Sequence, residues 1–171
     1  MKIKDLQVIR TSSPLHKTAG TNWLFVKILT DTDIVGWGEG SLQYKDSALE
    51  AEISDMKKFL LDKNPLNIED IWTSLFRKVT WSGGAVTMSA ISAIDLALWD
   101  IKGKALGVPV YELLGGKYRD RIWSYGRWDG DTPESAVEHA LAQKSTGLTA
   151  LKGDPFDHKG LFISYEAEKK P

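Results

Sequence analysis

Residues 149–155 read Thr-Ala-Leu-Lys-Gly-Asp-Pro, a short strand pattern that finishes on charged residues. Side chains alternate along a strand, so Ala150, Lys152 and Asp154 share one face. In α/β folds the chemistry lies at the carboxyl ends of strands that belong to βα repeats. This position makes Lys152 and Asp154 candidate catalytic residues. A same-face ion pair with a purely structural role is the alternative.

The sequence on either side of this strand repeats the βα pattern. Residues 122–126 form a predicted strand, and a helix follows in which Thr132 is the N-cap and Pro133 the first helical residue. Gly147 ends that helix, and residues 161–170 have the pattern of a further helix. This β-α-β-α order is typical of a parallel α/β fold. Two strands cannot bury a parallel sheet, and an eight-stranded barrel takes roughly 250 residues, so the pattern predicts only the first part of a parallel α/β fold.

The first forty residues have an antiparallel pattern instead. Residues 3–10, 23–30 and 34–39 are rich in strand-forming side chains, and a short polar turn joins the second and third segments. Such a connection makes those two strands antiparallel neighbours. A long polar stretch, residues 11–22, separates the first two strands and contains His16.

Helical periodicity follows this meander. Helices are predicted over residues 47–60, 68–77 and 85–106, and the last of these is the longest. Gly107 and then Pro109 form its stop signal. The pattern therefore predicts an α+β domain, a three-stranded antiparallel meander plus helices, followed by the first βα units of a parallel α/β fold.

The composition argues against several classes of function. The 171 residues carry 22 basic and 23 acidic side chains, a net charge of −1 without a long run of either sign, so neither nucleic acid nor a membrane surface is expected as partner. The absence of cysteine excludes disulfides, thiolate metal sites and thiol nucleophiles. No apolar segment approaches membrane-spanning length and no signal-peptide pattern is present, so we expect a cytoplasmic protein.

The long helix carries a family resemblance. Residues 90–116 read AISAIDLALWDIKGKALGVPVYELLGG, which resembles the signature of the mandelate racemase/muconate lactonizing enzyme group of the enolase superfamily. The meander, with Gly-Trp-Gly-Glu at residues 36–39, resembles the capping domain of that group, and residues 149–156 resemble its second barrel strand. The segment 150–156 is most similar to the acid-sugar dehydratases, particularly the gluconate and galactonate dehydratases.

The resemblance implies proton abstraction next to a carboxylate, with Mg²⁺ stabilising the anion and a lysine or histidine acting as base. The family's metal ligands and its His-Asp pair lie on later barrel strands, so we expect this chain alone to bind no Mg²⁺ and to be inactive. Lys152 matches the first lysine of the family's Lys-x-Lys motif. Asp154 stands where many members have the second, base-forming lysine. The aspartate at this position fits a dehydratase that uses a histidine from a later strand better than one that uses a lysine base on this strand.

The resemblance also implies a substrate-binding role for the long loop of the capping domain, which the family lays over the barrel mouth. His16 in this loop and Trp23 at its end are therefore the predicted substrate-binding residues. The alternatives are a solvated loop histidine and a tryptophan that packs within its own strand.

The resemblance implies an α+β capping domain, residues 1–116, followed by the first two βα units of a truncated TIM-type barrel, residues 117–171. Two classes of function are open at this point. The first is Mg²⁺-dependent dehydration of a sugar acid by an enzyme of which this chain is an inactive N-terminal part, with a racemase or cycloisomerase of the same group as a variant. The second is a non-catalytic, stand-alone capping-domain remnant. The expected partners are a small-molecule sugar acid and other chains, as a homo-oligomer or through the exposed barrel strands.

Overall fold

The computed structural model describes residues 1–12, 22–77, 80–130 and 132–153. The chain forms two compact units, the first spanning Met1–Lys117 and the second beginning at Tyr118. The described part of the first unit contains the predicted meander and helices, and the described part of the second contains two strands joined by a helix.

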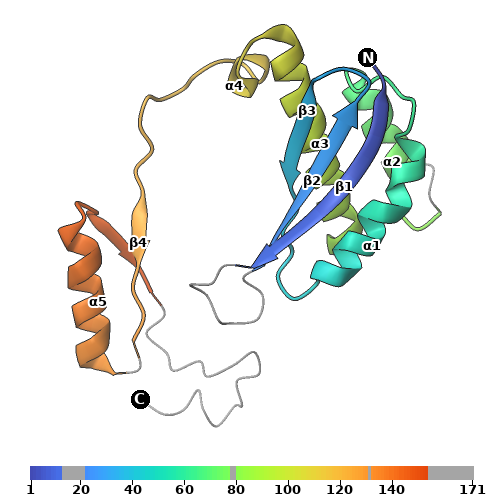
Figure 1. Cartoon of the computed structure of the whole chain (residues 1–171). Coiled ribbons are helices and arrows are strands. Elements are labelled where there is room, and N and C mark those ends of the chain that lie inside the picture. Colours follow the sequence, from blue (N-terminus) through green and yellow to red (C-terminus); the bar gives the residue numbers. More distant parts are fainter. Residues whose placement is uncertain (13–21, 78–79, 131, 154–171) are drawn as a thin grey trace. The chain divides into compact units, whose positions relative to one another are not determined.

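The meander forms a three-stranded antiparallel sheet in the order β1-β2-β3 (Figure 1). Strand β1 is Ile3–Ser12, β2 is Asn22–Thr30 and β3 is Val35–Glu39. The register pairs Val8 with Val26 and Lys27 with Trp37. The antiparallel prediction is confirmed, with strand bounds that differ from the prediction by one or two residues.

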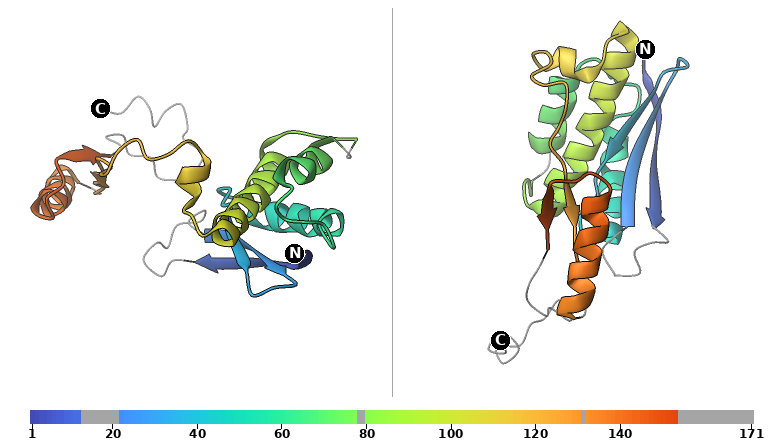
Figure 2. Two further views of the ribbon diagram at one scale, coloured as in Figure 1. Left: turned by 90° about the horizontal axis from the view of Figure 1, so that it is seen from above. Right: turned by 90° about the vertical axis from the view of Figure 1, so that its left-hand side faces the viewer.

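Helices cover one face of this sheet (Figure 2). Helix α1 is Asp46–Met56, a single 3₁₀ turn, η1, follows at Lys57–Phe59, α2 is Ile68–Arg77 and α3 is Ala85–Leu106. The predicted bounds of α2 and α3 are confirmed. The first predicted helix, residues 47–60, is instead an α-helix that tightens into the 3₁₀ turn.

The hydrophobic core lies between the sheet and the helices. Alternate residues of β2, namely Leu24, Val26 and Ile28, are completely buried, as alternation along a strand requires. They pack with buried side chains of all three helices, among them Leu49, Ile53, Ile71, Leu75, Ile91, Ile94, Leu98 and Ile101.

Strand β3 and helix α3 pack with their backbones unusually close. A Cβ atom added at Gly36 would lie 2.2 Å from the backbone oxygen of Ala97, and one at Gly38 would lie 2.0 Å from that of Ala93. Glycine on the strand and alanine on the helix therefore make this approach possible.

Helix α3 also protects the outer edge of the sheet. The carboxylate of Asp100 accepts a hydrogen bond of 2.9 Å from the backbone N–H of Trp37. Lys104, one turn further on, donates to the backbone oxygen of Val35 at 2.7 Å and to Asp100 at 2.6 Å. These contacts satisfy edge groups of β3 that otherwise favour pairing with another chain.

The predicted stop signal of α3 is confirmed. Gly107 has a φ of 68°, in the left-handed region that glycine adopts without steric cost. The N–H of Val108 donates to the carbonyl of Gly103 at 3.0 Å, which closes the last turn. A four-residue helix, α4 at Val110–Leu113, follows and was not predicted.

The second unit contains β4 at Tyr125–Arg127, α5 at Pro133–Ser145 and β5 at Ala150–Lys152. The two strands are parallel neighbours, as predicted, although both are shorter than predicted and β4 ends one residue later. Thr132 caps α5 as predicted, because its hydroxyl accepts from the N–H of Ser135 at 3.2 Å. The helix predicted over residues 161–170 lies outside the described residues.

Candidate functional site

The candidate site is the carboxyl end of the parallel pair β4–β5. The register pairs Tyr125 with Ala150 and Arg127 with Lys152. Parallel strands present their carboxyl ends at the same edge, so Arg127 and Lys152 end adjacent strands side by side. In α/β folds this edge carries binding and catalytic groups.

Lys152 is the last residue of β5 and its side chain is exposed. Its ammonium nitrogen lies 5.8 Å from the centroid of the Tyr125 ring, within cation–π range. Its backbone carbonyl accepts a hydrogen bond of 2.9 Å from the N–H of Trp128, which extends the ladder past β4. The structure thus places this predicted residue at a strand end with its charged group accessible.

The orientation of Lys152 follows from the position of α5. Gly126, the middle residue of β4, faces this helix: an added Cβ would lie 2.8 Å from Oε1 of Gln143 and 2.9 Å from Cδ1 of Leu148. Neighbours in a strand point to opposite faces, so Tyr125 and Arg127 face away from α5. Lys152 shares their face, as its contact with Tyr125 shows.

The other predicted site residues are described only in part. Asp154 and His16 lie outside the described residues. Trp23 lies on β2, is about half exposed at 47%, pairs with Thr11 of β1 and stacks on Phe25 with ring centroids 6.2 Å apart. The stacking agrees with the alternative of packing within the strand, while the exposed part of the ring is available for other contacts.

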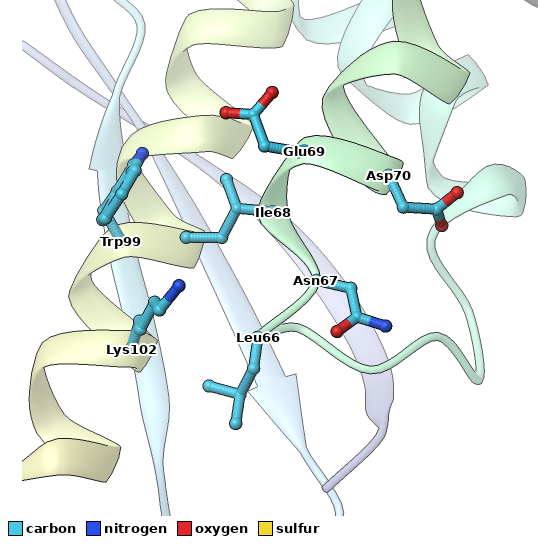
Figure 3. Close-up of a pocket in the computed structure, with 7 residues that line it drawn as sticks. All are labelled: Leu66, Asn67, Ile68, Glu69, Asp70, Trp99 and Lys102. Atoms are coloured by element: carbon cyan, nitrogen blue, oxygen red, sulfur yellow. The ribbon is translucent and has the colours of Figure 1, made fainter.

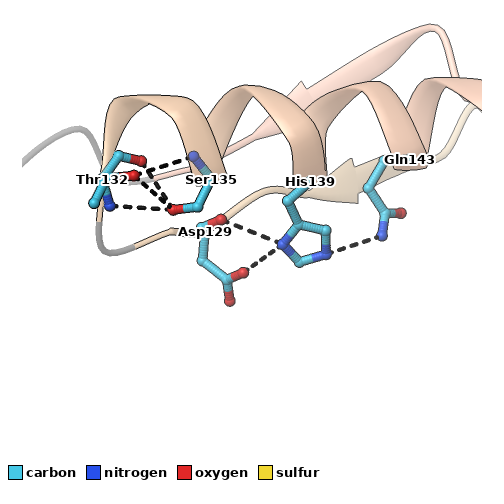
Figure 4. A network of polar contacts seen from close by, with 5 residues as sticks. All are labelled: Asp129, Thr132, Ser135, His139 and Gln143. Carbon is cyan, nitrogen blue, oxygen red and sulfur yellow. Dashed lines mark hydrogen bonds and ion pairs between the residues drawn. The ribbon is translucent and has the colours of Figure 1, made fainter.

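Sequence reasoning missed a polar network beside this edge. Nδ1 of His139 on α5 lies 2.5 Å from a carboxylate oxygen of Asp129 in the loop after β4, and its Nε2 lies 3.5 Å from Gln143 (Figure 4). The network and the Thr132 cap fasten the two ends of the β4–α5 loop to the helix. Asp129 and His139 are ten residues apart, and the loop between them breaks any helical or strand repeat. The sequence therefore gives no periodic signal for their contact.

The first unit has a separate pocket of about 310 Å³ between α2 and α3 (Figure 3). Leu66, Ile68 and Trp99 form its apolar part, and Asn67, Glu69, Asp70 and Lys102 its polar part. The ammonium of Lys102 lies 5.3 Å from the Trp99 ring centroid. The pocket therefore combines an aromatic wall with charges of both signs.

Neither place is a metal site in the part of the chain that the structure describes. Within those residues no cluster of three or more His, Asp or Glu side chains is arranged to hold an ion. The described strand ends carry two cations, Arg127 and Lys152, which repel Mg²⁺ rather than bind it.

None of the helices in the described residues combines the length and apolar character needed to cross a bilayer.

Comparison with known proteins identifies the family. The N-terminal domain of the mandelate racemase/muconate lactonizing enzyme family matches residues 3–115. The chain belongs to this family of the enolase superfamily. It consists of the N-terminal capping domain, with its antiparallel three-stranded sheet and helices, and the start of the parallel-strand barrel.

Individual relatives are similar over most of the chain. D-galactonate dehydratase of Xanthomonas axonopodis pv. citri is 47% identical over 150 residues, which are 87% of this chain and 39% of that enzyme. A crystal structure of an enolase from Pantoea ananatis with bound D-gluconate and Mg aligns with a TM-score of 0.78 and 35% identity, over 90% of this chain and 36% of that chain. A member of the enolase superfamily from Salmonella Typhimurium aligns with a TM-score of 0.79 and 36% identity, over 90% and 42%. The chain thus spans about two fifths of the length of these relatives.

Proposed function

We propose that this chain forms the capping domain and the opening of the barrel in an acid-sugar dehydratase. The observation that carries the proposal is the exposed Lys152 at the carboxyl end of β5, facing away from α5, in a chain 47% identical to a D-galactonate dehydratase. In a (β/α)₈ barrel the face away from the helices is the interior, and the carboxyl ends of the strands form the active site. Lys152 therefore belongs to the inner rim of the assembled barrel.

The proposed reaction removes the proton next to the carboxylate of a sugar acid of the galactonate or gluconate type. The neighbouring hydroxyl then leaves as water, and the resulting enol becomes a 2-keto-3-deoxy acid. The negative charge that develops on the carboxylate needs stabilisation, which Lys152 supplies as a fixed cation. We assign to Asp154 the task of keeping that lysine protonated, because a neighbouring opposite charge favours the charged amine.

In the proposed capping domain, residues 1–116, we keep His16 and Trp23 as proposed substrate-binding residues. Residues 117–171 open the barrel. We expect Mg²⁺ in the assembled enzyme, as in the Pantoea ananatis structure, and its ligands to come from barrel strands other than β4 and β5. The chain by itself therefore neither binds Mg²⁺ tightly nor turns over sugar acids.

The test is turnover of D-galactonate and D-gluconate with Mg²⁺ by the whole protein that carries this chain. The expected result is a 2-keto-3-deoxy acid. Lys152→Met should lower kcat by about 10²–10³-fold, because one preorganised charge is lost. Lys144→Met is the matched control, since Lys144 is an exposed lysine in the last turn of α5.

Three results would overturn the proposal. The first is a wild-type protein that dehydrates no sugar acid. The second is an epimerised or cyclised product, which would assign a racemase or cycloisomerase instead. The third is an unchanged rate in Lys152→Met, which would leave the strand end with a structural role only.

A further inference from the structure

Arg127 is a second cation at the same edge as Lys152. It is the last residue of β4 and the register partner of Lys152. Neighbouring strands lie about 4.8 Å apart, so the two side chains begin side by side. Arg127 is exposed, as Lys152 is.

Both cations point to the face that α5 leaves open. Gly126 faces Gln143 and Leu148, so Arg127, its neighbour in the strand, faces the other way. Tyr125 lies on the same face as Arg127, two residues earlier, and its ring approaches the Lys152 ammonium at 5.8 Å. An aromatic ring and two cations thus share one surface.

The ends of the two strands are held in register by Trp128. Its backbone N–H donates to the carbonyl of Lys152 at 2.9 Å. Its indole ring covers Gly153 so closely that a Cβ there would lie 2.0 Å from a ring carbon. The residues that flank Arg127 and Lys152 therefore fix the positions from which the two cations extend.

The described residues supply no carboxylate partner for Arg127, and Asp154, the proposed partner of Lys152, lies outside them. No carboxylate of the described chain forms an ion pair with Arg127 or Lys152. Two adjacent cations repel each other, and an anion placed between them removes this repulsion. The planar fork of a guanidinium matches the two oxygens of a carboxylate, whereas a lysine supplies a point charge.

We propose that Arg127 is a substrate-binding residue that holds the carboxylate of the sugar acid beside Lys152. The proposal rests on the function proposed above and adds to it the group that selects an acid over a neutral polyol. Binding of the carboxylate by Arg127 needs no movement of β4, because the register already places Arg127 at the strand end beside Lys152.

Steady-state kinetics of the whole protein test this assignment. Arg127→Gln should raise KM for the sugar acid by about 10- to 100-fold, the loss expected for charge-assisted hydrogen bonds. Arg127→Lys should recover part of this loss, because the charge remains and the fork is absent. Arg121→Gln, a matched change of an exposed arginine before β4, should leave KM unchanged.

A second readout does not depend on turnover. Phenylglyoxal modifies accessible arginines, and peptide mass spectrometry maps the modified sites. D-galactonate should protect Arg127 and not Arg121, and galactitol, the neutral polyol, should protect neither.

The outcomes separate the two proposals. A wild-type enzyme that dehydrates sugar acids, with KM unchanged in Arg127→Gln and no protection of Arg127, overturns the inference alone. An equal rise in KM in Arg127→Gln and Arg127→Lys, together with a lowered melting temperature of both variants, also overturns the inference, because the residue would then be structural. Protection of Arg127 without turnover by the wild type supports acid binding and overturns the dehydratase proposal.

Discussion

At the scale of single residues, Asp95 on α3 is a carboxyl of the first unit whose surroundings raise its pKa. Partial burial raises the pKa of its carboxyl, and the nearby carboxylate of Glu69 adds to this effect. A hydrogen bond from the Trp99 side chain acts in the opposite direction and is the weakest of the three influences. Glu69 and Trp99 also line the pocket between α2 and α3.

Asp95→Asn should therefore stabilise the protein at neutral pH, by about 0.5 kcal/mol, the usual range for a partly exposed site. A carboxyl with a raised pKa in the folded state lowers the stability at every pH above that pKa. As the pH falls through the folded pKa, protonation of the folded state removes this cost, so the gain from asparagine shrinks. The asparagine oxygen still accepts the Trp99 hydrogen bond.

Thermal melts of both proteins between pH 4 and pH 7 measure this dependence. Asp33→Asn, at an exposed turn, is the control and should show no such trend. A gain for Asp95→Asn that is the same at every pH would contradict the electrostatic explanation.

At the scale of elements, the contact between β3 and α3 distinguishes two kinds of steric barrier. A Cβ at Gly38 meets the backbone oxygen of Ala93 at 2.0 Å, whereas one at Gly40 meets the Ala93 methyl group at 2.6 Å. A backbone oxygen cannot be removed by mutation, but a methyl group can. The two glycines should therefore respond differently to a change at position 93.

Gly38→Ala and Gly40→Ala should each destabilise the protein by about 1–3 kcal/mol, the cost of overpacking. Ala93→Gly alone should cost about 1 kcal/mol in the helix interior. In the double variants, Ala93→Gly should recover most of the stability lost in Gly40→Ala and little of the stability lost in Gly38→Ala. Urea unfolding of the six proteins, wild type included, gives both coupling energies, and equal rescue at the two positions would contradict the contact geometry.

The success of sequence analysis at this scale depended on whether the deciding signal was local. Helix α3 was predicted with its true bounds because its periodicity and the stop at Gly107 lie within the segment itself. Strands β4 and β5 were predicted too long, because the length of a strand depends on its partners. Helix α4 was missed because four residues carry no periodicity.

The same distinction applies to the candidate site. The face of Lys152 could be predicted because alternation along its own strand indicates it, and its catalytic role stays a prediction. Arg127 was not singled out because the predicted strand stopped at residue 126 and because its proposed role depends on register with Lys152, across 25 residues of sequence. Pairing between strands that are distant in sequence leaves no pattern in a single sequence.

At the scale of the whole molecule, the two units differ in how much apolar surface they bury. Among the described residues, the buried hydrophobic core consists of first-unit residues. In the described part of the second unit only Gly126 is buried, while Ile122 and Trp123 are exposed at 80% and 77%. Val137 and Leu141, one turn apart on α5, are also exposed. A parallel sheet is stable only with both faces covered, so we predict that this unit depends on further barrel strands or on another chain.

Hydrogen exchange of the isolated 171-residue chain should therefore separate the units. Amides of α3 should exchange only when the unit unfolds globally. For a free energy of unfolding of about 5 kcal/mol, their exchange should be slowed by a factor of roughly 10³ or more. Amides of β4, α5 and β5 should show little protection in a dilute monomer, because their local opening exposes hardly any additional apolar surface. If chains associate through these strands, their protection should rise with concentration while that of α3 stays constant. Light scattering fixes the oligomeric state at each concentration, and equal protection of both units in a demonstrated monomer would show that the second unit is stable without a partner.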